Sequence, residues 1–102
     1  MTFYVQRHIM WIVIRSFRSK DADLIFHGRY SKLFHRLAPV IERKLMQINA
    51  AVTLSDLAIF PGNHLEALKR DRKGQHSIQI NDQYRICFVW RDGDAFEIEI
   101  AD

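Results

Sequence analysis

Alternating apolar and polar residues in the last third of the chain predict a run of β-strands. Ile78 and Ile80 point to one side of a strand whose other side carries Ser77 and Gln79. After a turn at residues 81–83, a second strand places Tyr84, Ile86, Phe88 and Trp90 on one face and Arg85, Cys87 and Val89 on the other. A tight turn at residues 91–94 leads to a last strand, in which Phe96, Ile98 and Ile100 alternate with Glu97 and Glu99. A period of two is typical of half-buried strands.

A helical period dominates the middle of the chain. Residues 39–51 place Ile41, Leu45, Ile48 and Val52 in one stripe, which is the spacing of a helix that packs on a core. The polar residues of this segment are expected on the solvent side: Glu42, Arg43, Lys44, Gln47 and Asn49. Residues 19–27 predict a shorter helix, which Ser19, Asp21 or Asp23 could cap and Gly28 could end.

The remaining segments complete the expected order of elements. Residues 11–17 are rich in β-branched and aromatic side chains and predict a further strand. Residues 29–36 are basic and fit either a loop or a helix, and residues 54–59 fit a turn or a short helix. The order is therefore a strand, two helices and a three-strand meander. It predicts an α+β fold, with the two helices on one face of a small sheet, in a single domain of 102 residues.

Charge is unevenly distributed along the chain. The net charge is only +3, but residues 7–36 hold seven Lys and Arg against two acids, whereas residues 92–102 hold five acids and no Lys or Arg. Such asymmetry permits contact with nucleic acid, although a solubilising surface explains the same charges. Apolar residues make up 48% of the chain, enough for a core, so intrinsic disorder is excluded.

Cysteine usage and the apolar runs indicate a cellular compartment. The single cysteine, Cys87, excludes an internal disulfide framework and fits a reducing compartment. We expect Cys87 to be a small buried side chain of a strand. The apolar run at residues 9–14 is too short to span a bilayer and lacks the cleavage site of a secretory signal. We therefore expect a cytoplasmic protein without a membrane partner.

Four cations gather in one loop. Lys69, Arg70, Arg72 and Lys73 lie within five consecutive residues. Lysine offers phosphate a point charge and arginine offers a planar fork, although a solvated loop would carry the same residues. Arg85 favours a functional reading, because an arginine in the middle of a strand must face solvent, bind a ligand or be paired.

Other candidate residues allow two interpretations each. His76, at the start of a strand, could act as an acid or base near neutral pH or have no special role. Tyr84 and Trp90 offer rings on which RNA bases stack, but their alternation with apolar residues also fits a core. Glu97 and Glu99 fit the surface, or partners for Arg85 and the loop cations. The sequence contains no spacing typical of a zinc cluster, a phosphate-binding loop or a dinucleotide site, so we expect neither metal nor cofactor.

Five segments together resemble the HigB toxins of the RelE-like superfamily, which are also called plasmid maintenance system killer proteins. They are residues 14–17 (IRSF), 42–45 (ERKL), 61–68 (PGNHLEAL), 74–78 (GQHSI) and 81–88 (NDQYRICF). Each segment alone is weak, but their joint order and spacing are specific. The resemblance covers residues 13–102.

The resemblance implies a RelE-like fold, in which two helices pack against a small twisted antiparallel sheet. It implies the toxin of a type II toxin–antitoxin system, which inhibits translation as a ribosome-dependent mRNA endoribonuclease without a metal or cofactor. It also implies a helix-turn-helix antitoxin of the HigA type as partner. Operator DNA would be bound only through that antitoxin.

The resemblance also assigns roles to single residues. Lys69 and Arg85 would hold the scissile phosphate, and Arg70, Arg72, Lys73 and Tyr84 would bind RNA. Glu66 stands where some relatives have a catalytic histidine, and Asp102 stands at the aspartate of a terminal Asp-Tyr-His. His76 is the candidate to replace part of the missing proton transfer.

Two departures from the family lead to further expectations. The chain given ends at Asp102, so the tyrosine and histidine of the family's catalytic set are not in it. The alternative function is therefore a catalytically impaired module that binds its antitoxin and modulates transcription of the operon. A third candidate is a general RNA-binding domain that uses the loop alone. Val13 falls where relatives begin, so we expect residues 1–12 to be an extension from an upstream start, ahead of a toxin domain at residues 13–102.

Overall fold

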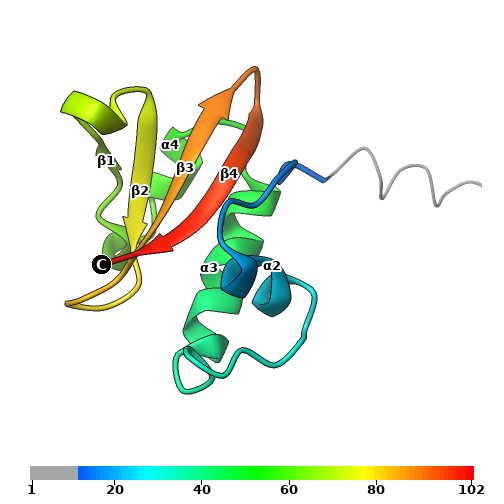
Figure 1. Ribbon diagram of the computed structural model, residues 1–102. Helices are drawn as coiled ribbons and strands as arrows, with labels where there is room; N and C mark the ends of the chain where they lie inside the picture. The colour runs from blue at the N-terminus through cyan, green and yellow to red at the C-terminus, as the bar shows by residue number, and fades with distance from the viewer. Residues whose placement is uncertain (1–11) are drawn as a thin grey trace, which may run out of the picture.

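The structure is a computed structural model that describes residues 12–102. Within this range, helices cover one face of an antiparallel sheet whose strands follow chain order, β1-β2-β3-β4 (Figure 1). The helices are α2 (Lys20–Phe26), α3 (Ala38–Ala50) and α4 (Ser55–Ala58), with 3₁₀ turns η1 (Pro61–Asn63) and η2 (Arg70–Arg72). The strands are β1 (Glu66–Ala67), β2 (Gln75–Gln79), β3 (Arg85–Arg91) and β4 (Asp94–Ala101). The predicted α+β class is confirmed.

The core lies between α3 and the sheet. Ile41, Leu45 and Ile48 form the predicted stripe of α3 and are fully buried. Ile78 and Phe88 are the buried counterparts on β2 and β3. Burying an aliphatic side chain of this size stabilises a fold by about 1.5–3 kcal/mol. The helical and strand periods read from the sequence therefore meet in one apolar layer.

Both predicted turns of the meander are confirmed. Asp92 and Gly93 join β3 to β4 with φ angles of 53° and 81°, and two consecutive positive φ values are typical of a two-residue hairpin turn. The other turn is closed by Asn81, whose Oδ1 accepts hydrogen bonds from the backbone N–H groups of Gln83 and Tyr84 at 2.9 and 2.7 Å. The short helix is also confirmed: Ser19 caps α2 through the N–H of Ala22.

The strand predicted at residues 11–17 is wrong for the part that the structure describes. Residues 12–17 run beside β4 but form only two isolated parallel bridges, Ile14 with Ala95 and Phe17 with Ile98. The reason is a bulge in β4, where Glu97 adopts a φ of 54°. The Glu97 N–H donates a hydrogen bond to the Ser16 hydroxyl at 2.9 Å rather than to a backbone carbonyl. The backbone hydrogen bonds of a continuous ladder are therefore interrupted here. Trp11 lies outside the described residues, as does all of the predicted extension except Ile12.

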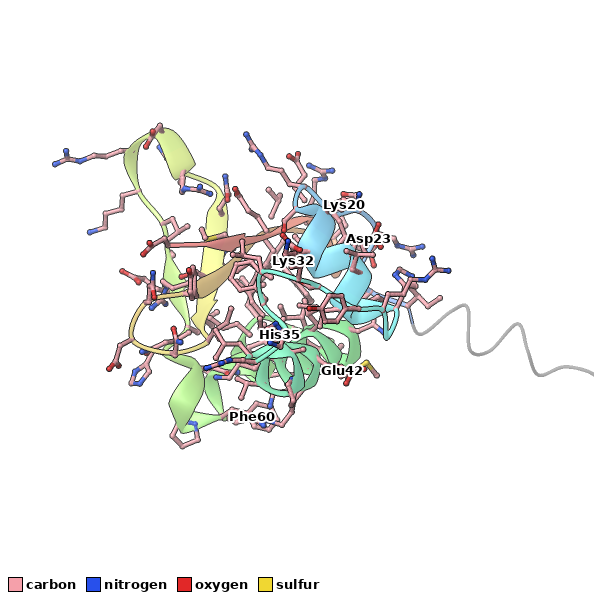
Figure 2. The ribbon with its side chains drawn as sticks, turned by 60° about the horizontal axis from the view of Figure 1, so that its bottom comes forward. Lys20, Asp23, Lys32, His35, Glu42 and Phe60 are labelled. Atoms are coloured by element: carbon pink, nitrogen blue, oxygen red, sulfur yellow. The ribbon has the colours of Figure 1, made fainter. Side chains whose placement is uncertain are left out.

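Two local expectations failed, and one alternative was resolved. Val52 is 77% exposed, because α3 ends at Ala50 and the chain then turns to an extended conformation. Lys44, expected in solvent, is only 6% exposed. Residues 29–36, which fitted a loop or a helix, form a loop that consists mostly of turns. Past α4, Phe60 is partly exposed beside η1 (Figure 2).

Candidate functional site

A polar surface covers the face of the sheet opposite the helices. Glu66, Ser77, Cys87 and Glu99 lie directly opposite one another on the four strands, and residues in register across a sheet share a face. Arg85 lies on the same face, two residues before Cys87. We call this surface the polar sheet face. Its residues are those that alternate with the apolar core residues along the strands.

Arg85 is held at one edge of its guanidinium group. Its Nε donates to the Ser77 hydroxyl at 2.7 Å, and its Nη2 donates to the backbone carbonyl of His64 at 2.9 Å. The Glu66 carboxylate lies 3.4 Å from Nη2. Within residues 12–102, Nη1 has no hydrogen-bond partner. An arginine fixed on one side presents its remaining N–H groups as a fork for a planar or tetrahedral oxyanion.

Two of the groups that hold Arg85 were missed by sequence reasoning. Ser77 is fully buried, so its hydroxyl is a fixed acceptor rather than a surface group. The sequence did indicate a polar position here, because Ser77 alternates with isoleucine on the strand that pairs with the strand of Arg85. The His64 carbonyl had no signal, since it depends on a left-handed φ of 46° at the end of η1, a conformation uncommon for residues other than glycine.

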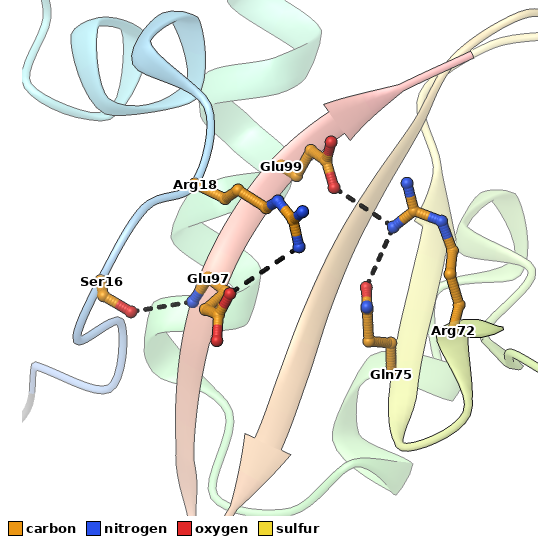
Figure 3. Close-up of polar contacts among 6 residues, drawn as sticks. All are labelled: Ser16, Arg18, Arg72, Gln75, Glu97 and Glu99. Atoms are coloured by element: carbon orange, nitrogen blue, oxygen red, sulfur yellow. Dashed lines mark hydrogen bonds and ion pairs between the residues drawn. The ribbon is translucent and has the colours of Figure 1, made fainter.

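Arg72 closes the basic loop onto the sheet. Its Nη1 donates to Gln75 at 3.1 Å and to Glu99 at 3.2 Å (Figure 3). The hydrogen bond to Glu99 raises the pKa of Arg72 above its usual value. Glu99 is therefore a partner of a loop cation, one of the two expectations for it. The neighbouring acid, Glu97, lies 3.9 Å from Arg18 instead.

The other loop cations face solvent. Lys69, Arg70 and Lys73 are exposed, and no carboxylate of the described residues lies within 4 Å of them. Arg70 has a φ of 59°, so the loop bends sharply between β1 and β2. Exposed cations in this loop, without a carboxylate partner among the described residues, favour the binding of a polyanion over a purely structural loop.

The remaining candidates lie at the edge of the site or away from it. His76 lies on the opposite face, where its ring stacks on Phe88 with centroids 6.4 Å apart. Tyr84 packs edge-on against Phe34 at 5.0 Å. Asp102 follows β4 at the end where Ala101 pairs with Arg85, and it accepts a hydrogen bond from Gln83 at 3.3 Å. The structure therefore brings Glu66 to Arg85 and leaves His76 apart.

Cys87 forms part of the floor of the polar sheet face. It is buried, as expected, and burial raises the pKa of its thiol while the nearby Arg72 guanidinium opposes that rise. The thiolate is the reactive form of cysteine. We expect iodoacetamide at pH 8 to alkylate Cys87 at least about tenfold more slowly in the folded chain than in the chain unfolded in urea. Equal rates would show that the reagent reaches the Cys87 thiol in the folded chain.

The fold and the site together define a class of protein: a small α+β domain with an arginine held at one edge of its guanidinium group on the sheet face opposite the helices. A family model described as RelE-like toxin of type II toxin-antitoxin system HigB matches residues 15–101. The chain is also 47% identical over 66 residues to "Toxin HigB-1" of Vibrio cholerae serotype O1 (strain ATCC 39315 / El Tor Inaba N16961), a match that covers 60% of this chain and 70% of that protein. The chain belongs to the HigB-like toxin family.

Family membership has a direct consequence for partners. A type II toxin is neutralised by a protein antitoxin, so this chain has an antitoxin partner. In the described part of the chain, no helix has the length and apolar character needed to cross a membrane. The same residues contain no group of three or more His, Cys, Asp or Glu side chains suited to a metal ion.

Proposed function

We propose that this toxin is an endoribonuclease that cleaves mRNA on cytoplasmic ribosomes and so inhibits translation. The observation that carries the proposal is the Arg85 guanidinium group, whose one edge is bonded to Ser77 and His64 while Nη1 has no partner among residues 12–102. Exposed Lys69 follows β1 and supplies a second charge. Positive charges at a fixed guanidinium group and a nearby strand end are suited to the negative charge that develops on a phosphate under attack.

The reaction that fits these groups uses the RNA itself as nucleophile. The ribose 2′-oxygen attacks the adjacent phosphorus, and the bond from phosphorus to the 5′-oxygen of the next nucleotide breaks. A 2′,3′-cyclic phosphate and a 5′-hydroxyl result, while one proton leaves the 2′-oxygen and another is taken up by the 5′-oxygen. Arg85 and Lys69 stabilise the crowded phosphate, and Glu66, 3.4 Å from Arg85, accepts the proton of the 2′-hydroxyl.

The basic loop binds the RNA strand next to the scissile phosphate. Arg70 and Lys73 contact phosphates directly, and Arg72 keeps the loop near the sheet through Glu99. His76 has no step in this mechanism, because its ring lies on the other face of the sheet. The antitoxin is of the helix-turn-helix HigA type, and operator DNA is bound through it.

Glu66→Gln tests the role of the carboxylate. We expect cleavage to fall by about 10²-fold, because general base catalysis commonly contributes that much, while the fold is unchanged because Glu66 is exposed. The rate is measured by primer extension on an mRNA in a translating extract. Glu97→Gln, at a second exposed glutamate, is the control and should retain full cleavage. Faster cleavage by Glu66→Gln would mean that Glu66 only neutralises Arg85.

One observation favours a second function, that of a module that binds antitoxin without cleaving RNA. Arg85 and Arg72 both already have carboxylate partners, Glu66 and Glu99. Expression of the chain without antitoxin separates the two functions. The nuclease predicts growth arrest and new mRNA 5′ ends, both relieved by the antitoxin. Binding of the antitoxin with intact mRNA, also after Tyr-His is appended to Asp102, would support the second function and overturn the first.

A further inference from the structure

A second basic surface lies outside the polar sheet face. It is the turn at residues 29–36, between α2 and α3, which we call the basic turn. Its exposed residues include Arg29, Tyr30, Lys32, His35 and Arg36. No carboxylate of the described residues lies within 4 Å of these cations. Figure 2 shows Lys32 and His35 on the same side of the molecule. The proposed cleavage mechanism makes no use of this surface.

The basic turn is anchored from beneath. Ser31 is almost fully buried, and its hydroxyl donates to Asp21 at 2.7 Å and accepts from the Phe34 N–H at 3.2 Å. The buried Phe34 ring packs against Tyr84, which directly precedes Arg85. The outward side chains therefore project from a fixed backbone, and one aromatic contact joins the turn to the strand that carries Arg85.

The turn displays a stacked pair of rings. Tyr30 is 69% exposed, and its ring lies 5.8 Å from that of His35 at an angle of 29°. His35 Nδ1 donates to the Lys32 carbonyl at 3.1 Å, and its Nε2 has no partner within the described range 12–102. A hollow of about 280 Å³ opens beside His35 and Arg29, with Ala38, Pro39 and the acidic Glu42 in its lining. Exposed rings among cations are typical of single-stranded RNA sites, because bases stack on them while the cations hold phosphates.

We infer that the basic turn is a second binding site for single-stranded RNA, with a base stacked on the Tyr30–His35 pair and phosphates held by Lys32 and Arg36. The choice of RNA as ligand rests on the proposed function. An acidic protein segment would satisfy the same cations, but it would leave the stacked rings and the hollow unused. With Arg85 on the sheet, the basic turn gives the toxin two separate contacts with RNA.

The test compares two double variants of the full chain. The turn variant is Tyr30→Ala with Lys32→Ala, and the control is Phe60→Ala with Lys20→Ala, which also removes one exposed aromatic ring and one exposed cation. Binding of a fluorescein-labelled ten-nucleotide RNA is measured by anisotropy from 50 to 200 mM NaCl. We expect the turn variant to bind this RNA at least about tenfold more weakly, because base stacking is lost. Its slope of log affinity against log salt should shrink by about 0.7, the loss of one phosphate contact, while the control is unchanged.

Other results overturn the inference. If the turn variant bound RNA as tightly as the unsubstituted chain, the basic turn would not be an RNA site. This holds whether or not Arg85→Ala weakens RNA binding. Unchanged RNA affinity with lost binding to the antitoxin would assign the turn to the protein partner instead. The proposed function can fail separately. If the chain caused no growth arrest and cleaved no mRNA, but its RNA binding still depended on Tyr30 and Lys32, the RNA site would stand and the nuclease function would be rejected.

Discussion

Arg85→Ala is expected to lower the rate of mRNA cleavage by about 10³- to 10⁵-fold, the range over which a single arginine acts on phosphate in other enzymes. The reason is geometric: Arg85 is bonded to Ser77 and His64 on one edge. Those bonds direct its Nη1, to which no residue of the described part of the chain is bonded. Alanine removes both the charge and the fork. Growth on expression without antitoxin, together with primer extension in a translating extract, measures the effect.

Arg85→Lys separates charge from geometry. Lysine keeps the positive charge but has no planar fork, so it cannot contact Ser77 and His64 and still present a second donor group in the same plane. We expect cleavage to stay more than about tenfold below that of the unsubstituted chain. Arg91→Ala is the matched control, because Arg91 ends the same strand and stacks on Phe96 at 4.4 Å. Growth arrest by Arg85→Ala as strong as that of the unsubstituted chain would exclude Arg85 from the reaction.

Part of this site could be read from the sequence because strands alternate. Arg85 stood among apolar neighbours at a period of two, which required a partner or a ligand, and the structure supplies Ser77, His64 and Glu66. The basic loop was visible as composition. The face of His76 was also implied, since it alternates with Ser77. What the sequence did not show was which strands would be neighbours, and therefore that Glu66 would lie beside Arg85.

The fold was predictable where local and tertiary preferences agree. The α3 stripe and the Asp92-Gly93 turn follow from spacing and from backbone conformation. The errors lie where a single tertiary contact overrides the pattern. The Ser16 hydroxyl takes the place of a ladder hydrogen bond at Glu97, and β1 is only two residues long. No periodicity can reveal either feature.

Lys44 illustrates the same limit and leads to the second large prediction. A lysine on the polar side of a helical pattern is normally solvated, yet here its ammonium group donates to the Gly62 carbonyl at 3.1 Å and to Asn63 Oδ1 at 2.9 Å. Burial, and then the charge of Arg43, lower the pKa of Lys44. The Asn63 amide in turn donates to Gln47 at 3.0 Å and to the Leu57 carbonyl at 3.1 Å. These bonds tie α3 to α4 and η1.

Asn63→Ala is expected to lower the free energy of unfolding by about 3 kcal/mol. The Lys44 ammonium group loses one of its two acceptors, and Gln47 and the Leu57 carbonyl lose the amide that donates to them. Each buried group left without such a partner costs about 1–3 kcal/mol. For a chain of this size the melting temperature should fall by about 12–24 °C. Urea unfolding and thermal melting measure the loss. Gln83→Ala removes an exposed amide and should change stability by less than about 0.5 kcal/mol.

Asn63 directly precedes His64, whose carbonyl holds Arg85. The Asn63→Ala variant should therefore also cleave mRNA more slowly at temperatures where it is still folded. A variant as stable as the unsubstituted chain would show that water replaces the Asn63 amide and that the bonds around Lys44 do not hold the helices together.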